Sequence, residues 1–130
     1  MCRLVNIKTN SGDTVRVADI KSVCVQNIIM QAQYCRCISE IILFGSSLEE
    51  RCTEESDIDI AIISRYTLNY LSRNKDFSRF IESVYDIDFT QEYDRLYFSS
   101  LDELKSKRND CEICDEILSH GKVIYSRQGD

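Results

Sequence analysis

The chain has 130 residues, which is enough for one domain with one hydrophobic core. Its hydrophobic share of 43% and charged share of 29% are those of an ordinary globular protein. Its net charge of -6 argues against a long nucleic acid as a partner, since nonspecific nucleic-acid binding depends on Lys and Arg. No apolar stretch approaches the length of a membrane span, and the start of the chain lacks the apolar core of a signal peptide. We therefore expect a cytoplasmic protein with no membrane association.

The first part of the chain predicts a hairpin and a helix. Strands at 3–7 and 14–18 flank a turn-rich segment, which predicts an N-terminal β-hairpin. A helix is predicted from about Asp19, its N-cap, to Tyr34. The helix has two apolar faces, which consist of Ile20, Val23, Cys24 and Asn27, and of Val25, Ile28, Ile29 and Ala32. A helix that is apolar on two sides is deeply buried or contacts a partner, and we favour deep burial.

Strands and helices alternate in the rest of the chain. Strands are predicted at 40–44, 58–64, 93–98 and 122–126, and helices at 67–85 (in one or two pieces), from Leu101 and at about 110–119. The strand at 58–64 is almost entirely aliphatic, which is typical of a central strand. Ser100 and Glu103 form a capping-box pattern at the start of a helix. No proline, repeat or low-complexity stretch marks an internal boundary, so we divide the chain into a hairpin extension, 1–18, and one domain, 19–130.

The most informative part of the sequence joins a Gly-Ser turn to two aspartates. Gly45 and Ser46 follow an apolar run, and Asp57 and Asp59 come after ten further residues. Side chains alternate along a strand, so both aspartates point to one face and the neighbouring isoleucines to the other. Two adjacent carboxylates repel each other unless a cation lies between them, and hard oxygen ligands suit Mg²⁺. A Gly-Ser turn allows close approach of a phosphate. The pattern indicates a phosphoryl-transfer site, and two solvated acids on an exposed sheet face are the alternative.

The seven cysteines, in a chain without a secretion signal, indicate reduced thiols rather than a disulfide framework. Cys35-x-Cys37 and Cys111-x-x-Cys114 together could supply four thiolates to a zinc ion. Cys111 and Cys114 also share a helical stripe with Ile117, so we interpret them as small apolar core residues. A zinc or redox module is the weaker alternative.

Taken together, these residues resemble the minimal nucleotidyltransferases of the DNA polymerase beta superfamily. The signature of that family is an apolar residue, Gly-Ser, a spacer of about ten residues, and Asp-x-Asp between apolar residues. The end of the chain, 116–125, also resembles the close of the family, so the resemblance covers about residues 19–126. It implies an α/β (α+β) nucleotidyltransferase fold, a single domain in which helices pack on a mixed sheet.

The resemblance also implies roles for individual residues. The nucleotide-binding residues would be Gly45, Ser46 and Ser47, and the residues that bind two Mg²⁺ ions, or Mn²⁺, would be Asp57 and Asp59. The family uses a third catalytic and metal-binding carboxylate from a neighbouring strand, and both Asp94 and Asp88 are candidates. We favour Asp94, because its strand leads into the C-terminal helices at about the expected distance.

One departure from the family pattern concerns the residues after Ser46. The family often has basic residues there, whereas this chain has Ser47, Leu48, Glu49 and Glu50. A basic group near the phosphates is therefore missing from its usual place. The candidates to replace it are Arg51, Arg65 and Lys75.

The resemblance implies transfer of a nucleoside monophosphate from an NTP, with ATP favoured, to an acceptor hydroxyl, with release of pyrophosphate. A chain of 130 residues has no room for a separate acceptor-binding domain, so the acceptor is expected to be a protein or a small molecule. Minimal members are often paired with a helical HEPN-type partner, and some act as antitoxins. A homodimer of this chain is the other assembly that we consider. The alternative is a weakly active or inactive module of the same fold that acts as an antitoxin-like, partner-binding protein.

Overall fold

The structure is a computed structural model that describes residues 1–127. A four-stranded mixed sheet forms its centre. Its strand order is β5-β4-β3-β6, with the strands β3 (Glu40–Phe44), β4 (Ile58–Ile63), β5 (Tyr93–Phe98) and β6 (Lys122–Ser126). Strand β3 runs antiparallel to β4 and β6, whereas β4 and β5 are parallel. The predicted α/β (α+β) class with a mixed sheet is confirmed.

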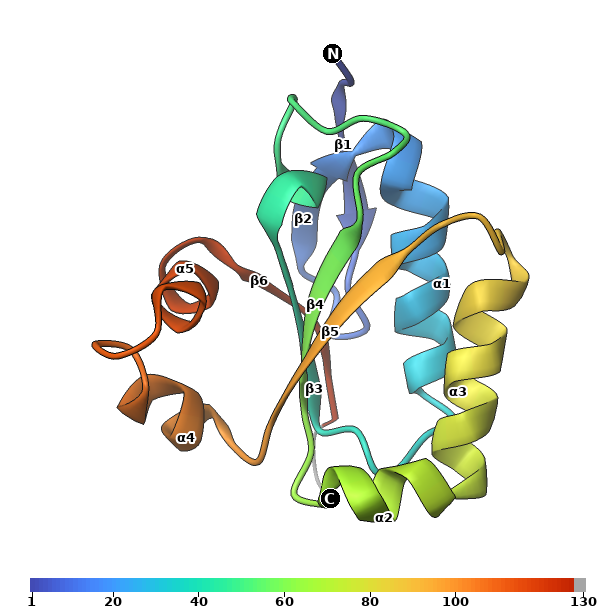
Figure 1. The fold of residues 1–130 in the computed structure, drawn as a ribbon. Helices are drawn as coiled ribbons and strands as arrows, with labels where there is room; N and C mark the ends of the chain where they lie inside the picture. Colours follow the sequence, from blue (N-terminus) through green and yellow to red (C-terminus); the bar gives the residue numbers. More distant parts are fainter. Residues whose placement is uncertain (128–130) are drawn as a thin grey trace.

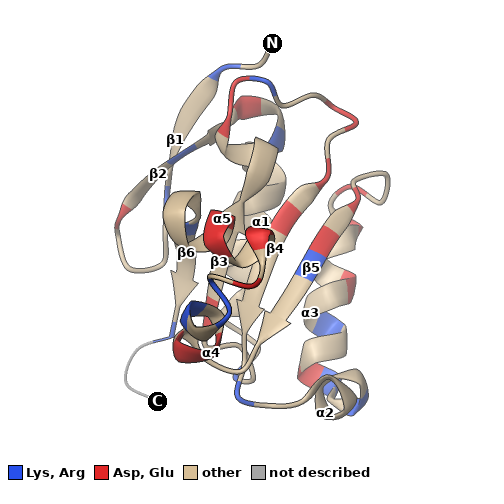
Figure 2. Ribbon diagram, turned by 60° about the vertical axis from the view of Figure 1, so that its left-hand side comes forward, with Lys and Arg blue, Asp and Glu red and all other residues tan. Residues whose placement is uncertain are grey.

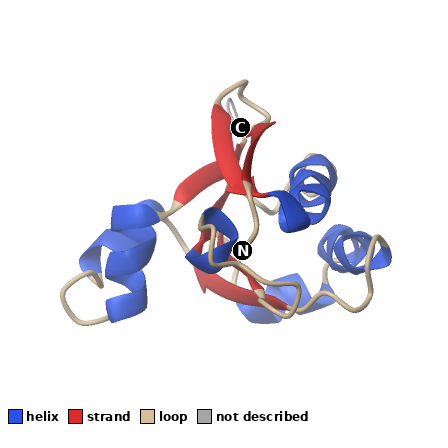
Figure 3. Cartoon of the chain, turned by 90° about the horizontal axis from the view of Figure 1, so that it is seen from above, coloured by secondary structure: helices blue, strands red, loops and turns tan. Residues whose placement is uncertain are grey.

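Helices cover both faces of this sheet (Figure 1 and Figure 3). The helices α1 (Ser22–Ala32) and α3 (Lys75–Asp86) lie on one face, and α4 (Leu101–Ser106) and α5 (Glu112–His120) lie on the other. The short α2 (Leu68–Arg73) lies at one end of the sheet, next to α3. Two 3-10 turns complete the chain, η1 (Asp19–Lys21) before α1 and η2 (Gly45–Leu48) after β3. None of the helices in the described part of the chain has the length and apolarity to cross a membrane.

The alternation of side chains along the strands produces two hydrophobic cores. The β4 residues Ile58, Ile60 and Ile62 are buried in the larger core, with α1 and α3. Ala61 and Ile63 are buried in the smaller core, with α4 and α5. Positions 57 and 59 have the same parity as Ala61, so the backbone directs both aspartates toward the α4–α5 side.

The N-terminal hairpin, β1 (Leu4–Lys8) and β2 (Thr14–Ala18), packs into the larger core. Ile7, Val15 and Val17 are buried there. At its turn, Asn10 joins the hairpin to β6, because its Nδ2 donates to the Ser126 carbonyl at 2.7 Å and its Oδ1 accepts from the Ser126 N–H at 3.0 Å. The hairpin therefore shares the core of the domain that follows it.

The first helix differs from its prediction. Its first turn is the 3-10 turn η1, and α1 begins at Ser22, so Asp19 is not its N-cap. The Asp19 carboxylate instead accepts from the N–H groups of Arg3 at 3.2 Å and Ile20 at 2.8 Å, which fixes the link between hairpin and helix. Only one apolar face of this helical segment is fully buried, and Ile20 and Val23 on the other face are exposed. The prediction that both faces are deeply buried was therefore wrong.

The predicted helix at 67–85 is divided into two. Asn74 ends α2 and caps α3, because its Oδ1 accepts from the N–H of Phe77 at 3.0 Å. The capping pattern at Ser100 is confirmed, since its Oγ accepts from the N–H of Glu103 at 3.1 Å. Its reciprocal bond is shifted by one residue, with the Glu103 carboxylate accepting from the N–H of Ser99 at 3.0 Å.

Candidate active site

The parallel pairing of β4 and β5 places two aspartates beside each other. Asp59 on β4 is opposite Asp94 on β5 in the register of the sheet. Both side chains belong to the face that carries α4 and α5, because Asp94 has the same parity as Leu96 and Phe98, which pack in the smaller core. Asp57 lies one residue before β4 begins, on the same side, and is half-buried. The three aspartates thus come from two adjacent strands at one end of the sheet.

Gly45 brings the backbone of the preceding turn directly against Asp59. Strand β3 ends at Phe44, which is opposite Asp59 in the antiparallel register. The chain then turns at Gly45 with a φ of 78°, a conformation that a side chain disfavours. A Cβ at this position would collide with the carboxylate of Asp59. Glycine is therefore required both for the turn and for the close approach of η2 to the aspartates.

A cavity of about 560 Å³ opens in front of these residues. Gly45 and Ser46 line one side of it, Asp59 and Asp94 line the sheet side, and α5 contributes Ile113 and Glu116, the latter an acid that the sequence did not single out. Figure 2 shows that acidic residues of β4, β5 and α5 gather at the same end of the sheet. The cavity is therefore an acidic site with a glycine-serine turn on one wall.

The electrostatics of Asp59 reflect this crowding. The pKa of Asp59 is raised from 3.8 to about 6, first by burial and then by a hydrogen bond to Asp94 and the negative charges of Asp94, Asp57 and Glu116. At neutral pH these carboxylates repel one another in a partly desolvated place. A cation between them relieves that repulsion.

The donor set fits the divalent cation that the resemblance implies. Carboxylate oxygens from adjacent strands, open to a cavity, are the ligands that Mg²⁺ and Mn²⁺ prefer. Within residues 1–127, however, no three His, Cys, Asp or Glu side chains are arranged to hold a metal ion as they stand. Rotation of side chains is therefore required to bring a third carboxylate to Asp59 and Asp94.

The structure separates Asp88 and Ser47 from this cavity. Asp88 is exposed in the loop after α3, where its carboxylate accepts from the N–H and the hydroxyl of Thr90 at 3.0 and 2.6 Å. Ser47 is 0% exposed, and its hydroxyl has no hydrogen-bond partner within the described residues. Its side chain therefore lies beneath η2, and only its backbone could reach a nucleotide.

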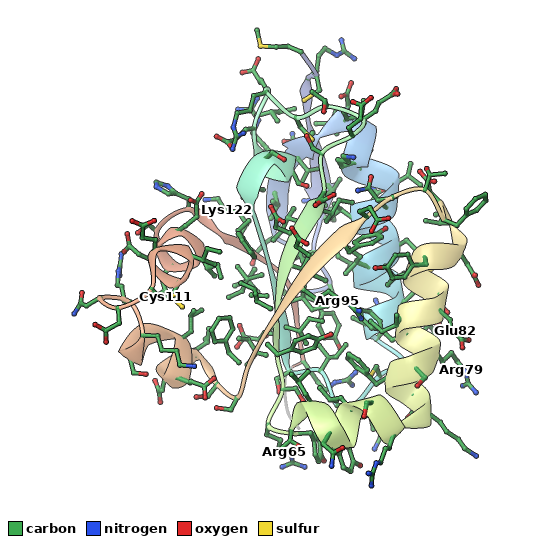
Figure 4. The ribbon with its side chains drawn as sticks, in the orientation of Figure 1. Arg65, Arg79, Glu82, Arg95, Cys111 and Lys122 are labelled. Carbon is green, nitrogen blue, oxygen red and sulfur yellow. The ribbon has the colours of Figure 1, made fainter. Side chains whose placement is uncertain are left out.

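Of the three candidate cations, Arg51 lies at the cavity. Its guanidinium forms a salt bridge with Glu49 at 2.8 Å and is largely exposed. Arg65 and Lys75 follow the far end of β4 and line other cavities, beside α2. A six-residue strand spans about 20 Å, so neither reaches the aspartates. Arg95 follows Asp94 and lines both the aspartate cavity and a cavity beside α3, and Figure 4 shows its side chain on the α3 side of the sheet.

A second cavity, of about 760 Å³, adjoins the first and shares Gly45 and Glu116 with it. It is lined by β2, η2, the end of α5 and the start of β6. Arg16 from the hairpin and Lys122 from β6 contribute positive charge there, on the far side of Gly45 from the aspartates. Sequence reasoning could not find this pair, because the two residues come from opposite ends of the chain.

The four cysteines considered as a zinc site are also separated. Cys35 and Cys37 are buried in the larger core, and Cys114 is buried in the smaller core on the other face of the sheet. The two pairs cannot bind one zinc ion. Cys111 is the N-cap of α5 and half-buried, and it packs at the margin of the smaller core, whereas Cys114 lies inside that core as expected.

Comparison with known proteins supports the fold. A comparison with curated proteins found no match. The family model "Polymerase beta, Nucleotidyltransferase" matches residues 26–130, which include η2, β4, β5 and all three aspartates. The match leaves out the hairpin and the beginning of α1. The chain therefore belongs to the polymerase beta nucleotidyltransferase family.

Proposed function

We propose that the protein transfers a nucleoside monophosphate, with AMP favoured, from an NTP to a hydroxyl of a protein or small-molecule acceptor. The observation that carries this proposal is the juxtaposition of Asp59 and Asp94 across β4 and β5, against the turn at Gly45. Asp57, Asp59 and Asp94 would hold two Mg²⁺ ions, which supply positive charge to the phosphates and to the attacking oxygen.

The residues of the chain have distinct roles in this proposal. The backbone at Gly45 and Ser46 binds the triphosphate, since this turn lines the cavity beside the aspartates. Arg16 and Lys122, in the adjoining cavity, supply the positive charge that is missing after Ser46. Asp94, the most exposed of the three aspartates, accepts the proton of the acceptor hydroxyl.

The reaction forms one bond and breaks one. The acceptor oxygen forms a bond to the α-phosphorus as its proton passes to Asp94. The bond between the α-phosphorus and its bridging oxygen breaks, and that oxygen leaves with the electron pair as part of pyrophosphate. The cavity is open to solvent at Asp94, which leaves room for an acceptor carried by another molecule.

The acceptor belongs to another molecule in this proposal, because four of the described helices cover the faces of the sheet and the short α2 lies at its end. A helical HEPN-type partner is the acceptor that we favour. The exposed side chains of Ile20 and Val23 on the first helical segment are compatible with a contact of this kind.

The second candidate is a catalytically weak or inactive module that binds a partner in the manner of an antitoxin. The observation that favours it is the salt bridge between Arg51 and Glu49, which engages an arginine of the cavity with a neighbouring acid. A pure binding module has no need of a metal-dependent nucleotide site, so Mg²⁺-dependent ATP binding distinguishes the two candidates.

The test is transfer of label from ATP labelled at the α-phosphate, with Mg²⁺ or Mn²⁺ and a lysate that contains candidate acceptors. We expect a labelled acceptor with the native protein and none with Asp94→Ala. The matched control is Asp88→Ala, which removes an exposed aspartate outside the cavity and should retain transfer. Absence of transfer with all four nucleotides, together with no metal-dependent binding of ATP, would leave the binding module as the function.

A further inference from the structure

Two cysteines occupy the first turn of α5 in an arrangement unlike that of the other thiols. Cys111 is the N-cap of the helix, and its Sγ accepts a hydrogen bond from the N–H of Cys114 at 3.2 Å. Figure 4 shows Cys111 at the edge of the molecule, where the loop from α4 enters α5. Cys114 is only 2% exposed and packs in the smaller core. One thiol of the pair is therefore accessible and the other is buried directly behind it.

The positions of the two residues favour a disulfide between them. Cys111 is the N-cap of α5 and Cys114 lies three residues later, so the first turn of the helix brings their side chains to the same side. The Cys111 sulfur already accepts a hydrogen bond from the N–H of Cys114 at 3.2 Å. A rotation at Cys111, together with an adjustment of the backbone at this N-cap, would bring the two sulfurs together.

The two thiols differ in the way that an exchange reaction requires. Hydrogen bonds from the side chain and the N–H of Cys114 lower the pKa of Cys111, and the positive charge of Lys107 adds to this effect. Burial raises the pKa of Cys114 to about 11. The N-terminus of a helix also favours a thiolate. Cys111 is thus the attacking thiol, and Cys114 is held in its protonated form nearby.

The pair Cys35 and Cys37 provides an internal contrast. Cys35 is completely buried and Cys37 nearly so, and burial raises the pKa of both thiols, that of Cys35 to about 11. No thiol of that pair is both exposed and stabilised as a thiolate. Two cysteines close in the sequence are therefore not sufficient for such a site, and the position of Cys111 at the start of a helix sets its pair apart.

We propose that Cys111 and Cys114 form a thiol–disulfide exchange site, whose oxidant is a disulfide of low molecular weight such as oxidised glutathione. The Cys111 thiolate attacks one sulfur of the incoming disulfide, and the S–S bond breaks to release one thiolate, which takes a proton from water. Cys114 then gives up its proton and attacks the Cys111 sulfur of the mixed disulfide, which releases the second thiol. The two protein thiols lose two electrons, and the incoming disulfide gains them.

The site adjoins the nucleotide cavity without belonging to it. Ile113 lies between the two cysteines and lines that cavity, and Glu116 follows one turn later. A disulfide would fix the first turn of α5, and with it one wall of the cavity. The exchange reaction itself does not depend on the proposed transferase function, and neither does its test.

In the experiment, the reduced protein is incubated in glutathione buffers that contain an increasing fraction of oxidised glutathione. Remaining thiols are then alkylated, and the peptides are analysed by mass spectrometry. We expect a disulfide between Cys111 and Cys114, while Cys35 and Cys37 remain alkylated. We also expect iodoacetamide to modify Cys111 several-fold faster at neutral pH than Cys2, the other half-buried cysteine, which serves as the matched control.

Two variants separate the roles of the cysteines. Cys111→Ser preserves an N-cap residue and hence the helix, and it should abolish the disulfide. Cys114→Ser should accumulate the mixed disulfide with glutathione on Cys111, and Cys114→Ala serves if a buried hydroxyl prevents folding. Alkylation of Cys111 no faster than that of Cys2, or no mixed disulfide in either Cys114 variant, would overturn the proposal.

Discussion

Gly45 has both a backbone conformation and a neighbour that exclude a side chain. Its φ of 78° costs a residue with a Cβ about 1–2 kcal/mol, and the Cβ would also collide with Asp59. We therefore expect Gly45→Ala to lower the free energy of unfolding by more than the backbone cost alone and to abolish ATP binding. Urea denaturation and equilibrium binding of ATP measure the two effects.

The matched control for this prediction is Gly12→Ala. Gly12 has a φ of 92° in the hairpin turn, but a Cβ there meets no atom within 4 Å. It should show the backbone cost alone, with ATP binding unchanged. Equal losses of stability in the two variants would contradict the close contact between Gly45 and Asp59.

Asp59 makes the stability of the metal-free protein depend on pH. Its folded pKa of about 6 lies above its ordinary value of 3.8, so the folded state binds the proton more tightly than the unfolded state. The free energy of unfolding should therefore fall as pH rises from about 4 to about 6 and remain low above that. Solvent screening of this half-buried group reduces the effect to about 1 kcal/mol.

Asp59→Asn should remove this decline and stabilise the metal-free protein at neutral pH. Urea denaturation with a chelator present, at several pH values, measures the difference between variant and native protein. Asp110→Asn, in the exposed loop between α4 and α5, removes the same charge far from the carboxylate cluster and is the control. The prediction would be contradicted if the free energy of unfolding of the native protein and that of Asp59→Asn depended on pH to the same extent.

The main residues of the candidate site were available from the sequence for a simple reason. Asp57 and Asp59 lie on one strand beside a Gly-Ser turn, so their spacing alone predicts a common face. The choice between Asp94 and Asp88 required the structure, because it depends on which residue is in register with Asp59. Glu116 was missed because the position of α5 over the cavity depends on tertiary packing, which its own sequence does not specify.

At the level of elements, a buried lysine connects the segments that position Asp57. Lys21 is 1% exposed, and its Nζ donates to the Glu54 carbonyl at 3.1 Å and to Gln91 Oε1 at 2.6 Å. Gln91 in turn donates to the Ser56 carbonyl at 3.1 Å. The loop before β4 is thereby held to the start of α1 and to the segment that precedes β5.

Lys21→Met should destabilise the protein by about 1–3 kcal/mol, because it leaves the Glu54 carbonyl and Gln91 without a donor. Amide hydrogen exchange should become faster in residues 53–57, and the affinity for Mg²⁺ should fall. Lys105→Met, an exposed lysine on α4, should change neither. Unchanged exchange at 53–57 in Lys21→Met would show that this loop does not depend on the lysine.

The strands were predicted more accurately than the helices, and the physical reason lies in their signals. Each strand is a short apolar or alternating segment that is rich in β-branched or aromatic residues, and every observed strand lies within about one residue of its prediction. Their order in the sheet, with β6 beside β3, depends on contacts between distant segments and was not predicted. Asn74, which divides 67–85 into two helices, acts through a cap that apolar periodicity does not reveal.

At the level of the whole molecule, the hairpin outside the family match contributes to the main core. Ile7, Val15 and Val17 are buried against residues of α1 and β3 in that core. A chain that begins at residue 19 should therefore lose cooperative thermal unfolding, measured by circular dichroism. The milder Ile7→Ala should lower the free energy of unfolding by about 2–5 kcal/mol.

The control for the hairpin is Asn10→Ala, which removes two hydrogen bonds to β6 but no buried apolar surface. It should cost about 1 kcal/mol or less for each bond and leave cooperative unfolding intact. A chain from residue 19 that unfolds as cooperatively as the full chain would show that the hairpin is a separate attachment.

The parallel contact between β4 and β5 has a consequence for folding kinetics. Asp59 and Asp94 meet only after the whole connection through α2 and α3 has formed, so their mutual repulsion is absent from the unfolded chain. Contacts between distant segments are slow to form and are expected after the main folding barrier. A divalent cation bound by this pair should accordingly slow the unfolding rate while the refolding rate changes little. The bound cation would then stabilise the folded state without stabilising the transition state for folding.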